Sequence, residues 1–458
     1  MNLPNLIILS CFKCISFRAK LKFKNYFMKH IKIYLLLLAV GITGKSWSQD
    51  LLNTISKAET ERIEKYLSSD ELEGRKTFSK GIDKAAAFIA NEFAQAGLAT
   101  FKNSASYLQS FSRMSARFIS ASGNFDGTAI DQKNIIVVTP QANFSITEAS
   151  GYEVVKINKE DNLGMAVRKY MGAGKNYLIL MDESFAQNFS RLTNLKSNIT
   201  ENQKSVVFVL SNLTPSKFTI EATHKIENLS LANVVAVIPG KSLSNEYVIF
   251  SGHYDHLGIN SARAVNGDSI YNGANDDAAG TTAMIMLSKY FKKLNNNERT
   301  LIFAAFTAEE VGGFGAQYFS KQFDPLSVKA MFNLEMIGTE SKWGRNSAYI
   351  TGYEKTDMGA ILQKNLAGTA FTFYPDPYTD QNLFYRSDNA TLARLGVPAH
   401  TISTSKMDSE PNYHKPSDEF QTLDIDNMNE IIKAIAKSAQ SIIAGKDTPT
   451  RVDTTQLK

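Results

Sequence analysis

The chain has 458 residues, of which 43% are hydrophobic and 21% are charged, and its formal net charge is +5. This composition is typical of a globular protein, and the length allows two or three domains. The excess positive charge lies at the N-terminus, because residues 1–48 hold eight basic and no acidic side chains, whereas residues 49–458 hold 42 basic and 45 acidic ones. The main part of the chain therefore lacks the charge of a basic nucleic-acid-binding protein, and we expect no nucleic-acid partner.

Residues 1–48 are predicted to be a secretory signal peptide, with Met28 as an alternative start. Basic residues follow Met28, the apolar segment 33–42 comes next, and small residues precede a cleavage site after Ser48. Ten apolar residues are too few to cross a bilayer as a helix, which needs about 20. We therefore expect no stable membrane span after cleavage, and a secreted, periplasmic or cell-envelope protein.

Two regions of different texture follow this segment. Residues 49–117 are expected to form a helical lead-in, because 60–67 and 81–97 have the composition of helices and the second ends at a glycine. Residues 118–227 are expected to form a β-rich insertion or small domain, in which short β-like runs alternate with Asn, Ser, Thr and Gly. These runs are 134–138, 152–157, 177–181 and 205–210.

Residues 228–445 are predicted to form the main α/β domain, and a polar tail follows at 446–458. The runs 246–250 and 300–306 are β-branched and aromatic with little alternation, which is typical of central strands buried on both faces. Between them, 278–294 has apolar residues at helical spacing and ends in lysines, which favour a helix C-terminus. The other expected elements are strands at 233–240, 330–338 and 397–402 and a helix at 425–443.

Ionisable side chains lie directly after these predicted strands or just before the predicted helix. In open α/β sheets, ligands bind in the crevice beyond the carboxyl ends of the strands. We therefore expect these side chains to share one crevice. They are His253, Asp255, Asp276, Asp277, Glu309, Glu310 and Glu335.

This set has the chemistry of a hydrolytic zinc site. Such a site needs nitrogen and oxygen ligands that leave a position open for water, together with a general base. Of the adjacent Glu309 and Glu310, one could bind metal and the other accept the proton of water. Asp255 could accept the second N–H of His253. The candidate ligands, enough for two ions if one carboxylate bridges them, are His253, His414, Asp276, Glu310 and Glu335.

Three other histidines are expected to have no direct role in the chemistry. We predict that His256 and His400 are structural or support a ligand, and that His224 is a surface residue.

Six motifs, in their order and spacing, resemble those of the zinc metallopeptidases of family M28, which include secreted aminopeptidases. The resemblance covers residues 233–443. The motifs are His253-Tyr-Asp255-His, Gly-Ala-Asn-Asp276-Asp277-Ala-Ala-Gly, Glu309-Glu310-Val-Gly-Gly-Phe-Gly-Ala, Asn-Leu-Glu335-Met-Ile-Gly, Ser387-Asp388 and Tyr413-His414-Lys-Pro-Ser-Asp.

The resemblance implies a three-layer α/β/α sandwich with a mixed, mostly parallel central sheet, two Zn²⁺ ions, and peptide or protein substrates. It implies that Asp276 bridges the ions and that Glu309 is the general base. His253 and Glu335 would complete one ion site, and Glu310 and His414 the other. Supporting roles are implied for Asp255, Asp277 and Asp388.

Two positions qualify this comparison. Glu335 stands where the family often has an aspartate, so the geometry of that ion is expected to differ. Tyr385 lies near the expected substrate loop and is a candidate to polarise the scissile carbonyl.

Aminopeptidase activity is the leading expectation, and the alternatives are a carboxypeptidase or dipeptidase, a glutaminyl cyclase-like enzyme with a single zinc, or a non-catalytic binding protein.

Overall fold

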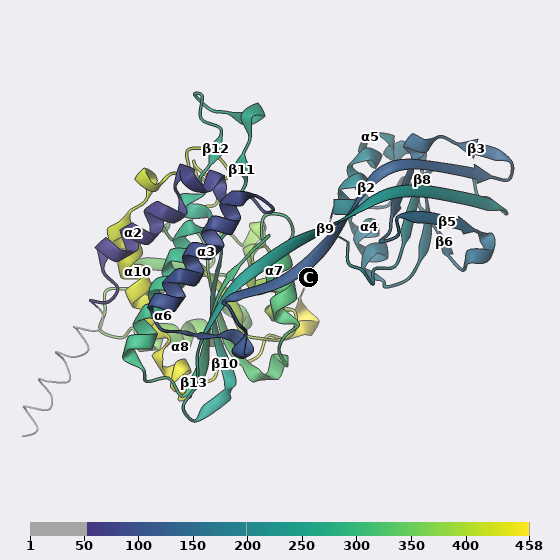
Figure 1. Cartoon of the computed structure of the whole chain (residues 1–458). Coiled ribbons are helices and arrows are strands. Elements are labelled where there is room, and N and C mark those ends of the chain that lie inside the picture. The colour runs from purple at the N-terminus through teal and green to yellow at the C-terminus, as the bar shows by residue number, and fades with distance from the viewer. Residues whose placement is uncertain (1–52, 198, 458) are drawn as a thin grey trace, which may run out of the picture.

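The computed structural model describes residues 53–197 and 199–457. Figure 1 shows a main body and a smaller lobe, joined by two long strands, β2 (Leu108–Phe125) and β9 (Phe218–Ile238). The predicted signal peptide at 1–48 lies outside the described residues. Within those residues, no helix combines the length and the apolar character needed to cross a bilayer.

A mixed sheet of eleven strands has the order β16-β15-β17-β14-β10-β13-β9-β2-β3, with β1 and β5 paired to β9; it begins in the body and continues along β2 and β9 into the lobe, where Figure 1 shows β3 and β5. Its centre is parallel, because β17, β14, β10 and β13 run in one direction, whereas β9 pairs antiparallel with β13. The remaining strands of this sheet are β1 (Ala99–Thr100), β3 (Thr128–Ile130), β5 (Asn143–Thr147), β10 (Leu243–His253), β13 (Arg299–Phe306), β14 (Val328–Leu334), β15 (Ser347–Ile350), β16 (Thr372–Pro375) and β17 (Ala399–Ser403).

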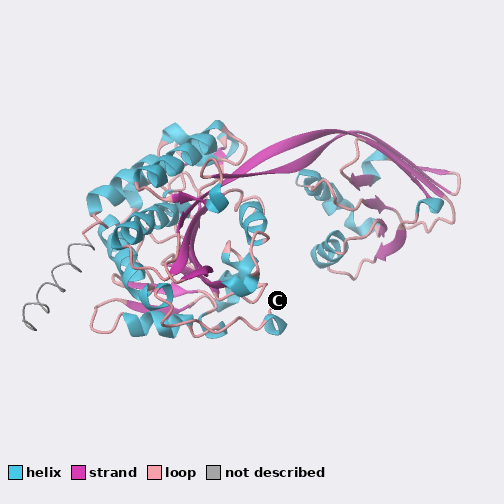
Figure 2. Ribbon diagram, turned by 60° about the horizontal axis from the view of Figure 1, so that its bottom comes forward, coloured by secondary structure: helices cyan, strands magenta, loops and turns pink. Residues whose placement is uncertain are grey.

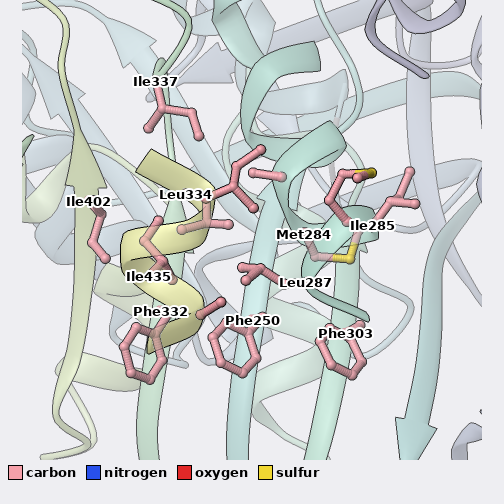
Figure 3. Packing of buried hydrophobic residues seen from close by; sticks show 14 of the residues in the cluster. Phe250, Met284, Ile285, Leu287, Phe303, Phe332, Leu334, Ile337, Ile402 and Ile435 are labelled. Atoms are coloured by element: carbon pink, nitrogen blue, oxygen red, sulfur yellow. The ribbon is translucent and has the colours of Figure 1, made fainter. Parts of the chain in front are cut away.

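One face of the sheet is covered by helices α6 (Ala279–Leu294), α10 (Ile425–Ser438), α2 (Lys57–Leu67), α3 (Lys80–Gln95) and α8 (Met358–Asn365). Figure 3 shows Phe332, Phe250 and Phe303 side by side on neighbouring strands, with side chains of α6 against them. The ring of Phe250 stacks on that of Phe332 at 4.8 Å and on that of Phe303 at 5.6 Å between centroids. This apolar layer fixes the spacing of the strands whose ends carry the candidate site.

The opposite face of the sheet is covered by helices α7 (Phe314–Ser320) and α9 (Asn389–Ala393), through Phe319 and Leu392. Successive residues of β10 point to opposite faces, so Ile249 joins this layer while its neighbours on the strand join the first. Figure 2 shows helices on both sides of the magenta sheet. The predicted three-layer sandwich with a mixed sheet is confirmed.

The element boundaries differ from the sequence expectation at three places. Strand β14 ends at Leu334, so Glu335 lies in the loop that follows it. The run 233–240 is the end of the much longer β9. The helix expected at 425–443 is divided into α10 and α11 (Gln440–Ile443).

The smaller lobe contains its own four-stranded sheet in the order β4-β8-β7-β6, in which β6, β7 and β8 are parallel. Apolar clusters lie against it, and helix α4 contributes to one of them. The expected limits of the insertion, 118 and 227, fall inside β2 and β9, so the chain enters and leaves the lobe along continuous strands. The elements are β4 (Ile135–Val138), β6 (Glu153–Ile157), α4 (Leu163–Gly172), β7 (Tyr177–Met181), α5 (Ala186–Phe189) and β8 (Val206–Leu210).

Beside the carboxyl ends of the central strands, the short strands β11 (Gly258–Ile259) and β12 (Ile270–Tyr271) form a hairpin that projects from the body in Figure 1. It joins the residues after β10 to the segment that precedes α6.

Candidate metal centre

Three predicted ligands meet beyond the carboxyl ends of the central strands. His253 is the last residue of β10, and Glu335 follows β14 directly. The Nε2 atom of His253 lies 3.3 Å from Oδ1 of Asp276 and 3.4 Å from Oε1 of Glu335. One imidazole nitrogen and two carboxylate oxygens thus face one point, which is a donor set that zinc binds.

A second group of donors shares Asp276. The Nε2 atom of His414 lies 3.2 Å from Oδ2 of Asp276 and 3.3 Å from Oε2 of Glu310. Asp276 therefore presents one oxygen to each group, which is the arrangement that a carboxylate bridging two ions requires.

His256 also belongs to the second group. Its Nδ1 atom lies 2.7 Å from Oε1 of Glu310 and 3.9 Å from Oδ2 of Asp276, and its side chain is fully buried. The sequence analysis placed it among structural or supporting histidines, and the structure brings it directly against a candidate ligand.

The donor atoms are not satisfied by the protein. Among the described residues, Oδ2 of Asp276, Oε1 of Glu310 and Nδ1 of His256 are buried and have no partner in hydrogen-bond geometry. Buried polar atoms of this kind are normally hydrogen-bonded or bound to a metal. Imidazole and carboxylate groups gathered in this way fit a divalent cation.

Asp277 holds the backbone around these donors. It is fully buried, and its carboxylate accepts hydrogen bonds from the N–H groups of His253 (3.1 Å), Met336 (3.1 Å) and Gly280 (3.0 Å). A side chain at Gly280 would place its Cβ only 2.2 Å from the carbonyl oxygen of Leu334. Glycine at this position therefore allows α6 to begin close to the end of β14.

Asp255 connects the ends of β10 and β13. Its carboxylate accepts the N–H groups of Glu309 (3.0 Å) and Glu310 (3.3 Å) and the hydroxyl of Thr77 (3.1 Å). The Nδ1 atom of His253 lies 3.0 Å from the backbone carbonyl oxygen of Asp255 and 3.8 Å from its carboxylate. The expected carboxylate contact is thus replaced by a carbonyl contact, because the carboxylate is occupied by the turn that carries Glu309 and Glu310.

Asp418 was quoted within a motif but given no role by the sequence analysis. Its carboxylate accepts the N–H groups of Asn275 (2.8 Å) and Asp276 (3.0 Å), and burial raises its pKa to about 6. It therefore fastens the segment that carries His414 to the segment that carries Asp276. The signal in the sequence that could have indicated this role is the position of Asp418, four residues after the candidate ligand His414.

Arg75 was also missed, since it lies in a polar turn far away in sequence. Its buried guanidinium donates to the carbonyl oxygens of Tyr254 (2.9 Å), Asn272 (2.6 Å) and Gly273 (2.9 Å), and also to that of Leu67. These contacts hold the loop after β10 against the segment that leads to Asp276.

Glu309 and Asp388 lie in a region where carboxylates are difficult to ionise. Burial raises the pKa of Glu309 well above its usual range, and the negative charge of Asp388 adds to this effect. Asp388 is buried, and neither of its carboxylate oxygens has a hydrogen-bond partner among the described residues. Burial raises its pKa to about 8. Strongly shifted groups in a cleft are typical of functional sites.

The five candidate ligands and Glu309 line one cavity, whereas Asp388 is not among the described residues that line it. Tyr385, the candidate to polarise a carbonyl, is not among the described residues that line it; its ring instead packs against Phe384 and beneath Arg394. Tyr413 lines the cavity and stacks on His414 at 3.9 Å between ring centroids. The cavity is lined by His253, Asp276, Glu309, Glu310, Glu335, Met336, Tyr349, Thr351, Leu383, Arg386, Ser387, Thr401, Ser403, Met407, Tyr413 and His414.

Two further histidines in the described part of the chain, His400 and His224, do not line this cavity. His400 is structural, since its ring nitrogens contact Thr356 Oγ1 (2.7 Å) and the carbonyl oxygen of Thr351 (2.8 Å). The prediction that His224 is a surface residue is wrong. Its side chain is buried and its ring contacts that of Phe118 on β2, because His224 lies on the face of β9 whose residues alternate with outward ones.

The part of the chain that holds the candidate ligands matches the model of a known family. The model of Peptidase family M28 matches residues 233–439. These residues, which make up less than half of the chain, are similar to that family. The matched residues, 233–439, extend from within β9 to the end of α10 and include every candidate metal ligand.

Curated relatives are similar to part of the chain. A probable leucine aminopeptidase of Trichophyton verrucosum is 31% identical over 220 residues, which are 46% of this chain and 57% of that relative. A probable leucine aminopeptidase of Arthroderma benhamiae is 32% identical over 210 residues, which are 44% of this chain and 54% of the relative. The chain therefore spans little more than half the length of these relatives.

Solved structures show the same fold as the M28 region and its surroundings. An aminopeptidase from Aneurinibacillus sp. strain AM-1 has a TM-score of 0.51 and 16% identity, with 89% of this chain and 98% of that chain covered. A peptidase M28 precursor from Shewanella amazonensis has a TM-score of 0.50 and 15% identity, with 90% and 99% covered.

Proposed function

We propose that the protein is a secreted, zinc-dependent aminopeptidase that uses two zinc ions to remove N-terminal residues from peptides. The observation that carries this proposal is that the two carboxylate oxygens of Asp276 face different imidazoles. Its Oδ1 faces His253, and its Oδ2 faces His414. A single carboxylate placed between two imidazoles suits two neighbouring ions. The predicted signal peptide supports secretion.

The proposed ligands form two sets that share Asp276. His253 and Glu335 would complete the first set, and Glu310 and His414 the second. The longer side chain of Glu335 reaches the site from a loop, where the hydroxyl of Ser387 donates to its Oε2 at 2.7 Å. When bound, zinc polarises a carbonyl group and lowers the pKa of a coordinated water to near neutral.

Glu309 would act as the general base. It lies in the cavity beside both donor sets, and its carboxylate is not needed to complete either set. In this mechanism Glu309 accepts a proton from the attacking water and passes it to the leaving amine, so that the C–N bond breaks with a neutral amine product. Asp255 would keep Glu309 in place through its backbone N–H.

Asp277 and Asp388 would support this arrangement from the protein side. Asp277 fixes the backbone of His253, and the buried Asp388 follows Ser387, which donates to the proposed ligand Glu335. For the carbonyl-polarising group we propose Tyr413 in place of Tyr385, because Tyr413 lines the cavity beside a proposed ligand.

An apolar part of the cavity wall supports cleavage next to an apolar residue. Tyr349, Leu383 and Met407 pack together there. Such a surface suits a leucine-like side chain at the N-terminus, in agreement with the names of the curated relatives.

The test is hydrolysis of unblocked and N-acetylated peptides by the purified protein, with zinc content measured on the same sample. We expect release of N-terminal residues from unblocked peptides alone and about two zinc ions per chain. Release of C-terminal residues would indicate a carboxypeptidase. Full zinc loading without peptide cleavage would favour a glutaminyl cyclase-like or binding role, and absence of zinc would overturn the ligand assignment.

A further inference from the structure

Arg386 introduces a positive charge into a cavity dominated by carboxylates. Among the described residues that line the cavity, it is the sole lysine or arginine. Its side chain is exposed. It therefore lies where the cavity opens to solvent, whereas the apolar wall formed by Tyr349 and Leu383 is buried.

The guanidinium of Arg386 has only weak partners in the protein. Nη1 donates to Oε1 of Gln381 at 3.4 Å, and Nη2 donates to the hydroxyl of Tyr413 at 3.5 Å. Both acceptors are uncharged, and both distances are at the long limit of a hydrogen bond. A guanidinium held this loosely beside a cavity keeps its donors available for a carboxylate, which it can bind through two parallel N–H groups.

The position of Arg386 places this carboxylate close to the bond that is cleaved. The next residue, Ser387, donates to Glu335, and Tyr413 precedes His414, so Arg386 contacts the surroundings of both donor groups. The closed apolar wall is suited to the N-terminal side chain. The open side, where Arg386 lies, must then receive the residue that leaves.

We propose that Arg386 recognises a carboxylate on the leaving residue of the substrate. This inference rests on the proposed peptidase function and defines its substrate class. The carboxylate can be the free C-terminus of a dipeptide or an acidic side chain at the second position, because both are carboxylates attached to the same residue.

The experiment compares kcat/KM of the zinc-loaded, full-length protein on four substrates. Leucyl-alanine carries a C-terminal carboxylate, and leucyl-alanine amide carries none. Leucyl-aspartate amide carries a side-chain carboxylate, and leucyl-asparagine amide is its neutral counterpart. The variants are Arg386→Gln, Arg386→Lys and, as a matched control on an exposed arginine outside the cavity, Arg394→Gln.

We expect wild-type protein to prefer one or both carboxylate-bearing substrates over the neutral partner. Arg386→Gln should reduce that preference about tenfold or more, as expected for loss of a charge-assisted, two-point contact. Arg386→Lys should retain part of it, and Arg394→Gln all of it. The pair whose preference falls identifies the source of the carboxylate.

Two results would overturn the inference. One is an equal loss on all four substrates in Arg386→Gln, which would make Arg386 a positioning residue for Tyr413. The other is a wild-type protein without preference for either carboxylate. Failure of the proposed function would look different, since the wild type would then hydrolyse none of the four substrates, or would cleave leucyl-alanine equally well after N-acetylation, as a carboxypeptidase would.

Discussion

The imidazole of His256 and the carboxylate of Glu310 meet at 2.7 Å in the interior of the site, between Nδ1 and Oε1. The geometry of this contact is not that of a hydrogen bond. Neither atom has a hydrogen-bond partner elsewhere among the described residues. Glu310 directs its other oxygen, Oε2, towards His414. His256 is therefore placed either to orient Glu310 or to contribute a donor to the same ion.

Replacing His256 by Gln is expected to lower zinc affinity at one of the two sites by about 10–100-fold, because groups that orient metal ligands have effects of this size. Zinc affinity would be measured by competition with a chelator. His400→Gln is the matched control, since His400 is also buried but lies outside the cavity. Wild-type zinc affinity in His256→Gln would contradict the prediction.

Glu309→Gln should reduce kcat by about 10²–10⁴-fold, the usual contribution of a general base, while zinc content stays unchanged. The amide keeps the size of the side chain but cannot accept the proton. Steady-state kinetics and metal analysis on one preparation check this. Loss of zinc along with activity would instead indicate that Glu309 binds metal.

Arg75→Met should destabilise the protein by about 3 kcal/mol or more, because buried carbonyl groups lose their donor. Denaturant unfolding would measure the free energy. Arg345→Met provides the comparison, since Arg345 forms an exposed pair with Asp424 and should contribute far less to the free energy of unfolding. Equal effects of the two substitutions would show that Arg75 does not hold the site loops.

Glu64 makes stability depend on pH. It is fully buried on α2 and accepts the hydroxyl of Thr282 at 2.7 Å, and burial raises its pKa from 4.5 to about 8. The folded state thus binds this proton more tightly than the unfolded state. The resulting stability is complete below pH 4.5 and is lost as the pH rises through 8.

We therefore compare the free energy of unfolding of Glu64→Gln with that of the wild type at two pH values. The difference, variant minus wild type, should be a few kcal/mol larger at pH 9 than at pH 5. Thermal or denaturant unfolding at both pH values provides the measurement. Glu61→Gln is the control on the same helix, because Glu61 is paired with Lys65 near the surface. Parallel pH profiles for wild type and Glu64→Gln would exclude Glu64 as the titrating group.

The sequence by itself determined the order of strands and helices and the residue types at the strand ends. The apolar runs that became β10 and β13 were recognisable because central parallel strands are buried on both faces. From this order alone, His253, Asp276, Glu310 and Glu335 were expected in one crevice, since parallel strands bring their carboxyl ends together. The family resemblance then assigned roles to them.

Tertiary structure decided which groups surround the site. Arg75 comes from a turn before α3, and its donors reach loops that lie far away in sequence, so no local pattern could reveal the contact. The same holds for His256, whose distance from Glu310 depends on the path of the loop after β10. The choice between Tyr385 and Tyr413 as the residue that lines the cavity likewise follows from loop conformation.

His224 shows the physical reason for this division. Alternation along a strand tells which residues share a face, but which of the two faces is covered depends on the elements packed against it. In β9, His224 shares a face with the apolar Phe218, Ile220 and Ala222, and the packing of other elements on that face buries the histidine as well. Sequence thus sets periodicity and chemistry, whereas burial and contact between distant loops are fixed by packing.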